Sequence, residues 1–318
     1  MNLFPLFLSF LLTVLIYPPF IHQMDRLNTH QNVSDYSLEQ FKTKKKTPTM
    51  GGILFVLIPL LLALIIQPQS FLDLRMIVVY LTYLGYGLIG FWDDYKIVVE
   101  KNNAGLKPSH KFLAQLILAI LVYFIYRSFA SSLVTIPLLV QPLDLGWLYA
   151  GLIFFMFTGA SNGVNITDGM DGLAGGTVLI ALFGFFALTY QVAFTPLIYF
   201  ILLVMGSLAA YLIYNYHPAQ IIMGDTGSLA LGALLAVIAM VLKQEVLLIV
   251  FGGIFVFETL CVMIQIGSVK LFKRRVFRYT PIHYSFTLSG WKETRVVAFF
   301  WLLGLLCMMI GLILGGIV

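Results

Sequence analysis

The sequence predicts an all-α, polytopic integral membrane protein with ten transmembrane helices, organised as a single transmembrane domain over residues 1–318. Three observations lead to this fold class. Hydrophobic residues make up 60% of the chain and charged residues only 10%, whereas soluble domains carry roughly 25% charged residues. Apolar runs of about the length of a membrane-crossing helix recur along the whole chain. Lysine and arginine gather in alternate loops between these runs.

The expected spans are ten apolar runs, each near the roughly 17 to 25 residues that an α-helix needs to cross a bilayer. In chain order they cover residues 4–20, 51–66, 76–91, 112–126, 145–158, 173–190, 196–213, 228–242, 246–266 and 296–318. The first run has no basic segment before it and no small-residue cleavage site after it, so a retained helix is expected. Cys261 and Cys307 fall within runs, where packing is expected rather than a disulfide.

The distribution of positive charge predicts the orientation of these spans. Among the 19 Lys and Arg residues, only Arg75, Arg127 and Lys243 lie in one set of alternate loops. The positive-inside rule therefore predicts that both termini are extracytoplasmic and that the loops after spans one, three, five, seven and nine face the cytoplasm. Most of the basic residues are interpreted as topological anchors, and the net charge of +5 requires no nucleic-acid partner.

Polar segments without a topological purpose lie on the same predicted side. They occupy residues 46–52, 93–95, 165–172, 215–218, 223–228 and 281–283. The opposite loops carry no comparable cluster. This one-sided pattern predicts an enzyme with its active site at the cytoplasmic membrane surface. It argues against a transporter, which needs access from both faces and often shows matched interruptions in two halves.

Two pairs of aspartates are candidate functional groups at this surface. Asp93 and Asp94 follow the apolar run that ends at residue 91, and neighbouring helical positions diverge, so the two can serve different partners. A solvated helix end is the alternative. Asp168 and Asp171 lie in a glycine-rich loop next to Asn165, where the backbone can approach a ligand closely. A simple turn is the alternative there, and the spacing does not fit an EF-hand.

Asp225 stands just before the apolar run at 228–242, at a predicted helix N-terminus. It could merely cap that helix. However, the negative charge of five acids on one face would then be left without a balancing positive charge. A single divalent cation is the simplest way to balance it. Magnesium fits best, since it takes one or two carboxylates and completes its shell with water and phosphate oxygens. Together with the cations Lys44, Lys107, Lys111 and His283, this set indicates a site for a diphosphate.

Five segments together resemble a known family. They are Thr-Pro-Thr-Met-Gly-Gly at 47–52, Gly-Phe-Trp-Asp-Asp-Tyr at 90–95, Asn-Ile-Thr-Asp-Gly-Met-Asp-Gly-Leu-Ala at 165–174, Met-Gly-Asp-Thr-Gly-Ser at 223–228, and Pro-Ile-His-Tyr-Ser-Phe at 281–286 followed by Gly-Trp-Lys-Glu-Thr-Arg-Val-Val. In this order they resemble the phospho-N-acetylmuramoyl-pentapeptide transferases, of the polyprenyl-phosphate N-acetylhexosamine-1-phosphate transferase superfamily. The resemblance extends over nearly the whole chain.

The resemblance implies a magnesium-dependent homodimer in the bacterial plasma membrane, with ten transmembrane helices. It also implies the reaction, in which phospho-N-acetylmuramoyl-pentapeptide moves from its UDP carrier to undecaprenyl phosphate, giving lipid I and UMP. Asp93 resembles the acid that deprotonates the lipid phosphate, Asp94 its partner, and Asp225 the magnesium ligand. The remaining implied residues are Asp168 and His283 in catalysis, Gly169, Met170 and Asp171 in the uridine pocket, and Lys44, Thr49, Lys111, Asn165, Asn215 and Gln265 as further substrate contacts.

One departure from the family pattern concerns the histidine-rich loop. The family usually carries three consecutive histidines after Pro-Ile, whereas here the positions hold His283, Tyr284 and Ser285. Only the first is retained. Tyr284 can donate a hydrogen bond, but it is not a cation at neutral pH.

Two other enzyme classes are alternatives. A sister transferase that uses UDP-N-acetylglucosamine would share the metal and the lipid acceptor, and the 47–52 and 290–297 segments favour the muramoyl branch over it. An intramembrane aspartic protease also uses two acids near membrane helices. The segment before Gly224-Asp225 lacks the additional glycine expected of such a protease.

Overall fold

A computed structural model describes residues 2–29, 47–100, 105–137 and 141–317. The fold is a bundle of helices with one very short two-stranded sheet. The helices are α1 (Phe4–Arg26), α2 (Gly52–Ile66), the 3-10 helix η2 (Pro68–Leu72), α3 (Leu74–Glu100), α4 (Pro108–Arg127), α5 (Leu148–Thr167), α6 (Leu173–Gln191), α7 (Thr195–Asn215), α8 (Gly224–Val241), α9 (Glu245–Phe251), α10 (Gly253–Phe272), α11 (His283–Leu288) and α12 (Glu293–Leu314). The strands β1 (Leu133–Val134) and β2 (Leu143–Asp144) pair antiparallel.

Each expected apolar run falls on helix, which confirms the all-α, multi-pass class. Within the described residues, eight helices are long and apolar enough to cross a membrane: α1, α3, α4, α6, α7, α8, α10 and α12. The runs at 51–66 and 145–158 correspond to α2, which has 15 residues, and to α5, which is not among the eight. The number of ten transmembrane spans therefore stays a prediction.

The helix limits differ from the expected limits at three places. Helix α3 continues to Glu100 and α5 continues to Thr167, so Asp93, Asp94 and Asn165 lie on helices rather than in the loops after them. The run at 246–266 is divided into α9 and α10 at Gly252. Consecutive glycines at 252 and 253 explain the break, because glycine weakens a helix interior.

Helix α8 lies at the centre of the bundle. All its residues from Thr226 to Met240 are buried, as expected for a helix that is apolar on every side. Helices α3 and α5 pack against it. The outer helices instead expose large apolar side chains, among them Phe7, Leu11 and Leu15 of α1, which suits a surface that meets lipid.

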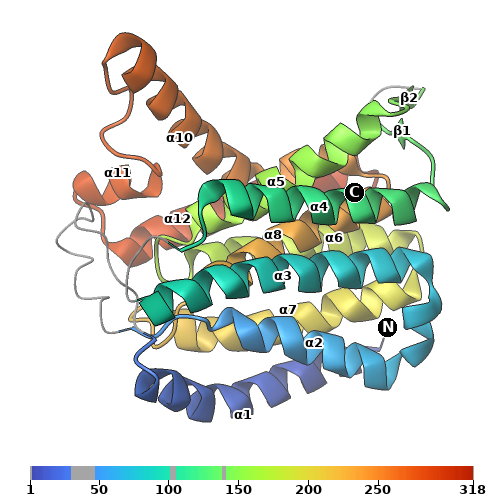
Figure 1. The fold of residues 1–318 in the computed structure, drawn as a ribbon, viewed down its shortest axis with the longest axis horizontal. Coiled ribbons are helices and arrows are strands. Elements are labelled where there is room, and N and C mark those ends of the chain that lie inside the picture. The colour runs from blue at the N-terminus through green and yellow to red at the C-terminus, as the bar shows by residue number, and fades with distance from the viewer. Residues whose placement is uncertain (1, 30–46, 101–104, 138–140, 318) are drawn as a thin grey trace.

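The polar segments meet at one end of the bundle. Figure 1 shows this end on the left, with α11 beside the first turn of α12 and the last turns of α1 and α3, while the β1–β2 hairpin lies at the opposite end. Hydrogen bonds and ion pairs join the C-terminal ends of α3 and α5 to the N-terminal ends of α4 and α8. The fold thus brings together helix ends that are 60 to 131 residues apart in sequence.

Candidate active site

Gly90 allows α3 to approach the first turn of α8 closely. A Cβ atom placed on Gly90 would lie 2.1 Å from the backbone oxygen of Asp225. Any other residue at position 90 would therefore push the two helices apart. The glycine brings Asp93 and Asp94, one turn further along α3, to the N-terminus of α8.

Asp94 caps α8 from outside that helix. Its carboxylate accepts hydrogen bonds from the backbone N–H groups of Asp225 and Thr226, both at 2.9 Å, and from the Thr226 hydroxyl at 2.6 Å. The free N–H groups and the dipole of a helix N-terminus favour a negative charge at this place. The sequence suggested Asp225 as a possible cap, but the structure gives this function to Asp94.

Asp225 is left available to interact with cations and amides. One of its carboxylate oxygens, Oδ2, forms an ion pair with the ammonium group of Lys111 from α4. Its other oxygen accepts a hydrogen bond of 2.6 Å from the Asn165 amide, which also donates to the Ser228 hydroxyl at 2.9 Å. A positive charge is thereby held against the acids at the end of α8.

Asp93 points to a different set of partners from Asp94, in agreement with the divergence of neighbouring helical positions. It accepts a backbone hydrogen bond of 2.8 Å from Leu106, and its Oδ2 lies 4.0 Å from the Lys111 ammonium nitrogen. Lys111 therefore lies between Asp93 and Asp225. The two acids come from helices α3 and α8 and share one cation.

Asp94, Asn165 and Asp225 border a cavity of about 190 Å³. We name it the acidic cavity, and its lining residues are Thr49, Asp94, Ile97, Asn165, Asp168, Ile222, Gly224 and Asp225. Carboxylates, an amide and a hydroxyl surround the space, so all the polar ligand atoms around it are hard donors of the kind that magnesium prefers. The structure thus brings together Thr49, Lys111, Asn165 and four of the predicted acids.

His283 forms a buried pair with Glu258 beside this region. The imidazole Nδ1 lies 3.0 Å from a carboxylate oxygen of Glu258, which also accepts hydrogen bonds from the backbone N–H groups of Ile282 and His283. Both side chains are fully buried. Nε2 of His283 has no hydrogen-bond partner among the described residues, and a Cβ on Gly169 would lie 2.3 Å from it. The imidazole therefore faces the backbone of the Asp168–Gly172 turn.

The sequence predicts that Glu258 pairs inside the bundle, but it gives this acid no role and no partner, because Glu258 lies inside an apolar run and 25 positions before His283. Only the packing of α10 against α11 reveals the pair. The presence of a lone acid in a membrane-spanning helix was the available signal, since such a group needs a partner.

Tyr284 and Ser285 occupy the two positions where the family usually carries histidine. The Tyr284 hydroxyl donates a hydrogen bond of 3.0 Å to the backbone oxygen of Gly169. Burial raises the pKa of Tyr284 well above its ordinary value, so the phenol keeps its proton and remains a donor. The Ser285 hydroxyl exchanges hydrogen bonds with the backbone of Tyr279. Tyr284 thus stabilises the Asp168–Gly172 turn, and Ser285 stabilises the segment before α11.

The structure does not place the other residues predicted to bind substrate in the lining of the acidic cavity, and Gln265 lines a different pocket. Asn215 accepts a hydrogen bond from Gly172 N–H and donates to the Ile221 oxygen, both at 2.9 Å, so it joins two loops. Gln265 bonds the backbone of Val276 and Phe277. Met170 is buried in a second apolar cluster. Lys44 lies outside the described residues.

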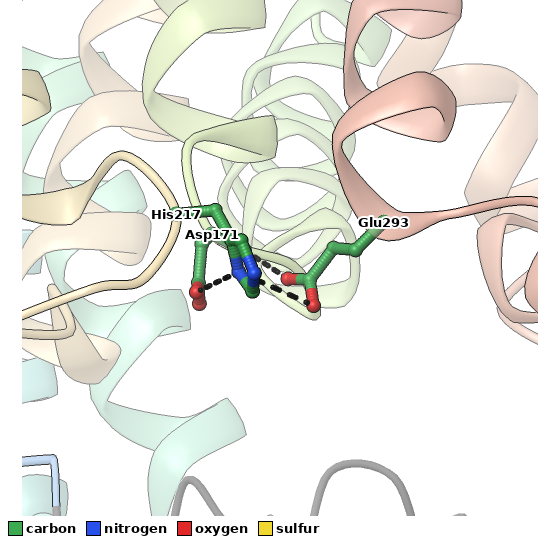
Figure 2. A group of neighbouring side chains, drawn as sticks. All are labelled: Asp171, His217 and Glu293. Atoms are coloured by element: carbon green, nitrogen blue, oxygen red, sulfur yellow. Dashed lines mark hydrogen bonds and ion pairs between the residues drawn. The ribbon is translucent and has the colours of Figure 1, made fainter.

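Asp171 belongs to a separate group with His217 and Glu293 (Figure 2). Its carboxylate accepts hydrogen bonds from His217 Nδ1 at 3.0 Å and from the Ala219 backbone at 3.1 Å. Its own N–H donates to Glu293 at 2.8 Å. The sequence did not single out His217 or Glu293 as parts of one group, since His217 lies in the loop after α7 and Glu293 at the start of α12.

Comparison with known proteins agrees with the motifs. The model of glycosyl transferase family 4 matches residues 76–243, and signature 1 of the phospho-N-acetylmuramoyl-pentapeptide-transferases matches residues 44–56. Among curated proteins of that name, the one from Oceanobacillus iheyensis is 44% identical over 95% of this chain and 94% of its own length. Those from Halalkalibacterium halodurans and Bacillus subtilis are 42% and 40% identical over 98% of the chain and 97% and 96% of their own lengths.

Proposed function

The chain belongs to the phospho-N-acetylmuramoyl-pentapeptide-transferase family, and from this premise we propose how its residues carry out the transfer. It moves phospho-N-acetylmuramoyl-pentapeptide from UDP-N-acetylmuramoyl-pentapeptide to a lipid carrier. The observation that carries this assignment is identity of 40–44% over nearly the full length of its relatives. We identify the carrier as undecaprenyl phosphate, with lipid I and UMP as products.

We place the diphosphate of the nucleotide substrate in the acidic cavity. The reaction requires an oxygen of the lipid phosphate to attack the phosphorus bonded to the sugar, while the bond from that phosphorus to the oxygen of UMP breaks. Both partners are anions, so positive charge must lie between them and the surrounding carboxylates. Lys111 already supplies one such charge, held between Asp93 and Asp225.

The donor set also fits magnesium. Asp94, Asp168 and Asp225 line the acidic cavity with carboxylate oxygens, and the lining contains neither cysteine nor histidine. Asp93 lies outside the lining and approaches this group through Lys111. Asp225 would be the protein ligand, with Lys111 retained beside it or displaced from Oδ2. When bound, magnesium would neutralise charge on the diphosphate oxygens.

Asp93 is proposed as the base that accepts the proton of the lipid phosphate. Asp94 is less suited to proton transfer, because three hydrogen bonds tie its carboxylate to the start of α8. We therefore assign Asp94 to hold Asp225 in position. Asp168 and His283 border the same region and are proposed to organise the phosphate groups.

The polar end of the bundle is proposed to face the cytoplasm of a bacterial plasma membrane, with both termini on the opposite side and ten spans in all. The strong asymmetry of lysine and arginine supports this orientation. The enzyme is further proposed to act as a homodimer, on the grounds of family membership.

A transferase assay with purified protein tests the assignment. UDP-N-acetylmuramoyl-pentapeptide and UDP-N-acetylglucosamine would be offered separately with undecaprenyl phosphate, and UMP release would be measured. We expect release from the first substrate alone, and loss of release when a chelator removes magnesium. Consumption of only UDP-N-acetylglucosamine would overturn the substrate, and release that persists in chelator would overturn the metal. Proteolysis without UMP release would instead indicate an aspartic protease.

A further inference from the structure

Three polar side chains from three different segments meet at the Asp168–Gly172 turn (Figure 2). Asp171 lies in the turn between α5 and α6, His217 in the loop between α7 and α8, and Glu293 at the first position of α12. His217 Nδ1 lies 3.0 Å from Asp171 Oδ2 and 3.8 Å from Glu293 Oε2. A single imidazole nitrogen thus lies between two carboxylates.

We propose that Asp171, His217 and Glu293 form a brace between three segments of the chain, which holds the Asp168–Gly172 turn in the shape needed to bind the nucleotide substrate. His217 and Glu293 would then be positioning residues for the transfer, which act through Asp171. This inference rests on the proposed function, since it assigns a binding role to that turn.

The brace fixes both the backbone and the side chain of Asp171. Glu293 accepts the Asp171 N–H at 2.8 Å, while the Asp171 carboxylate accepts from His217 at 3.0 Å and from Ala219 N–H at 3.1 Å. The side chains of Asp171 and Glu293 are 6% and 12% exposed. The His217 side chain is 42% exposed, so the brace is buried on the side of the two carboxylates and open to solvent on the side of the imidazole. Hydrogen bonds to a carboxylate are stronger than those between neutral groups.

The next residue of the turn is held as well. Gly172 N–H donates to Asn215 at 2.9 Å, and its carbonyl oxygen accepts from the Trp301 indole at 3.1 Å. Asn215 in turn donates to Ile221, two positions before the Met223 that precedes α8. The C-terminal half of the turn is therefore attached to α7, to the start of α8 and to α12.

The other half of the turn faces the reactive groups. Asp168 lines the acidic cavity, and Gly169 lies against His283 and accepts the hydrogen bond of Tyr284. Asp168 and Asp171 are only three residues apart, so a shift of the braced half displaces the half that faces the cavity. Small displacements of groups that orient a substrate can have large effects on its binding.

A metal ion is the competing explanation for the same three side chains. Their ligand atoms lie within 4.8 Å of one another, and zinc accepts both histidine and carboxylate ligands. A metal would have to replace the proton that His217 shares with Asp171. The observed 3.0 Å contact and the two backbone donors are accounted for by hydrogen bonding, so we assign the group to a proton-mediated brace.

The test uses the full-length protein in detergent, with UMP binding by calorimetry and transfer kinetics as readouts. His217→Ala and Glu293→Ala remove the brace, and each should raise the KM for UDP-N-acetylmuramoyl-pentapeptide and the Kd for UMP by about tenfold. The KM for undecaprenyl phosphate and the thermal unfolding midpoint should change little. The double variant should be no worse than the poorer single variant, since both act on one unit.

Conservative substitutions separate positioning from a merely structural role. His217→Asn keeps a donor at the place of Nδ1, and Glu293→Gln keeps an acceptor for the Asp171 N–H, so both should restore KM to within about threefold of the unsubstituted protein. Gln220→Ala in the same loop and His22→Ala on α1 are exposed controls that should bind UMP normally.

Two results would overturn the brace. Unchanged UMP affinity in both alanine variants would show that the shape of the turn does not depend on the brace. Stoichiometric zinc in the unsubstituted protein that is lost in His217→Ala would show a metal site instead. Failure of the proposed function would look different, because the unsubstituted protein would then release no UMP from UDP-N-acetylmuramoyl-pentapeptide. The calorimetric comparison of variants would still decide the role of the brace.

Discussion

Asp225 combines features that separate it from the other acids at the polar end of the bundle. It pairs with Lys111, accepts from Asn165, and borders the acidic cavity, while the capping of α8 is left to Asp94. Asp225→Asn keeps the shape and removes the charge. We expect a fall in kcat of more than about 100-fold, because a magnesium ligand would be lost.

The same variant should stay folded, with a thermal unfolding midpoint close to that of the unsubstituted protein. Asp73→Asn is a matched control, since Asp73 forms an exposed pair with Arg75 before α3, away from the polar end. It should retain full activity. Near-normal turnover of Asp225→Asn would remove Asp225 from the metal site.

Glu258 orients His283 through both the imidazole and the backbone. Glu258→Gln leaves one acceptor but removes the charge beside Nδ1, so we expect kcat to fall by about 10- to 100-fold with a small change in KM. Kinetics of Glu258→Gln, His283→Ala and the double variant form a thermodynamic cycle. Additive losses of kcat in the double variant would show that the two side chains act independently. Cys261→Ala, on the same face of α10, is the control and should leave kcat unchanged.

At the scale of elements, the close approach of α3 and α8 is set by a single glycine. Gly90→Ala places a methyl group where only 2.1 Å separates it from the Asp225 backbone oxygen. The helices must separate, which costs stability of about 1–3 kcal/mol and displaces Asp93 and Asp94. We expect a fall in kcat of about 100-fold or more.

Gly151→Ala on α5 provides the matched control, because open space surrounds that position. It should leave activity unchanged and raise the thermal unfolding midpoint slightly, since alanine favours helix. Full activity of Gly90→Ala, measured by UMP release, would contradict the assigned role of the α3–α8 contact.

The elements also show what the sequence could reveal. Apolar runs predicted the positions of the helices well, because lipid and core packing select long stretches without charge. They did not predict that α3 and α5 continue past the apolar residues, since packing against α8 stabilises turns whose composition is polar. The clustering of Asp93, Asp168 and Asp225 could be predicted from their common side. The Glu258–His283 pair could not, because it depends on the packing of α10 against α11.

At the scale of the whole molecule, the two ends of the bundle differ in chemistry. One end holds the acidic cavity, His283 and the brace. The other end holds the β1–β2 hairpin and Lys243. The ammonium group of Lys243 donates hydrogen bonds to the backbone oxygens of Ser131 and Leu133. Sixteen of the 19 Lys and Arg residues lie in the loops and helix ends that the sequence predicts to face the cytoplasm. The proposed orientation would let the enzyme meet a soluble nucleotide substrate on the side where that substrate is made.

This orientation predicts a labelling pattern. Cys261 and Cys307 would be replaced by alanine, and a single cysteine would be introduced as Ser131→Cys or Ser289→Cys, both exposed positions at opposite ends. In intact cells a membrane-impermeant maleimide should label Ser131→Cys and leave Ser289→Cys unmodified. Inverted vesicles should give the opposite result, and detergent should expose both. Labelling of both cysteines from one side would contradict the alternation of spans, and a reversed pattern would place the active site outside the cytoplasm.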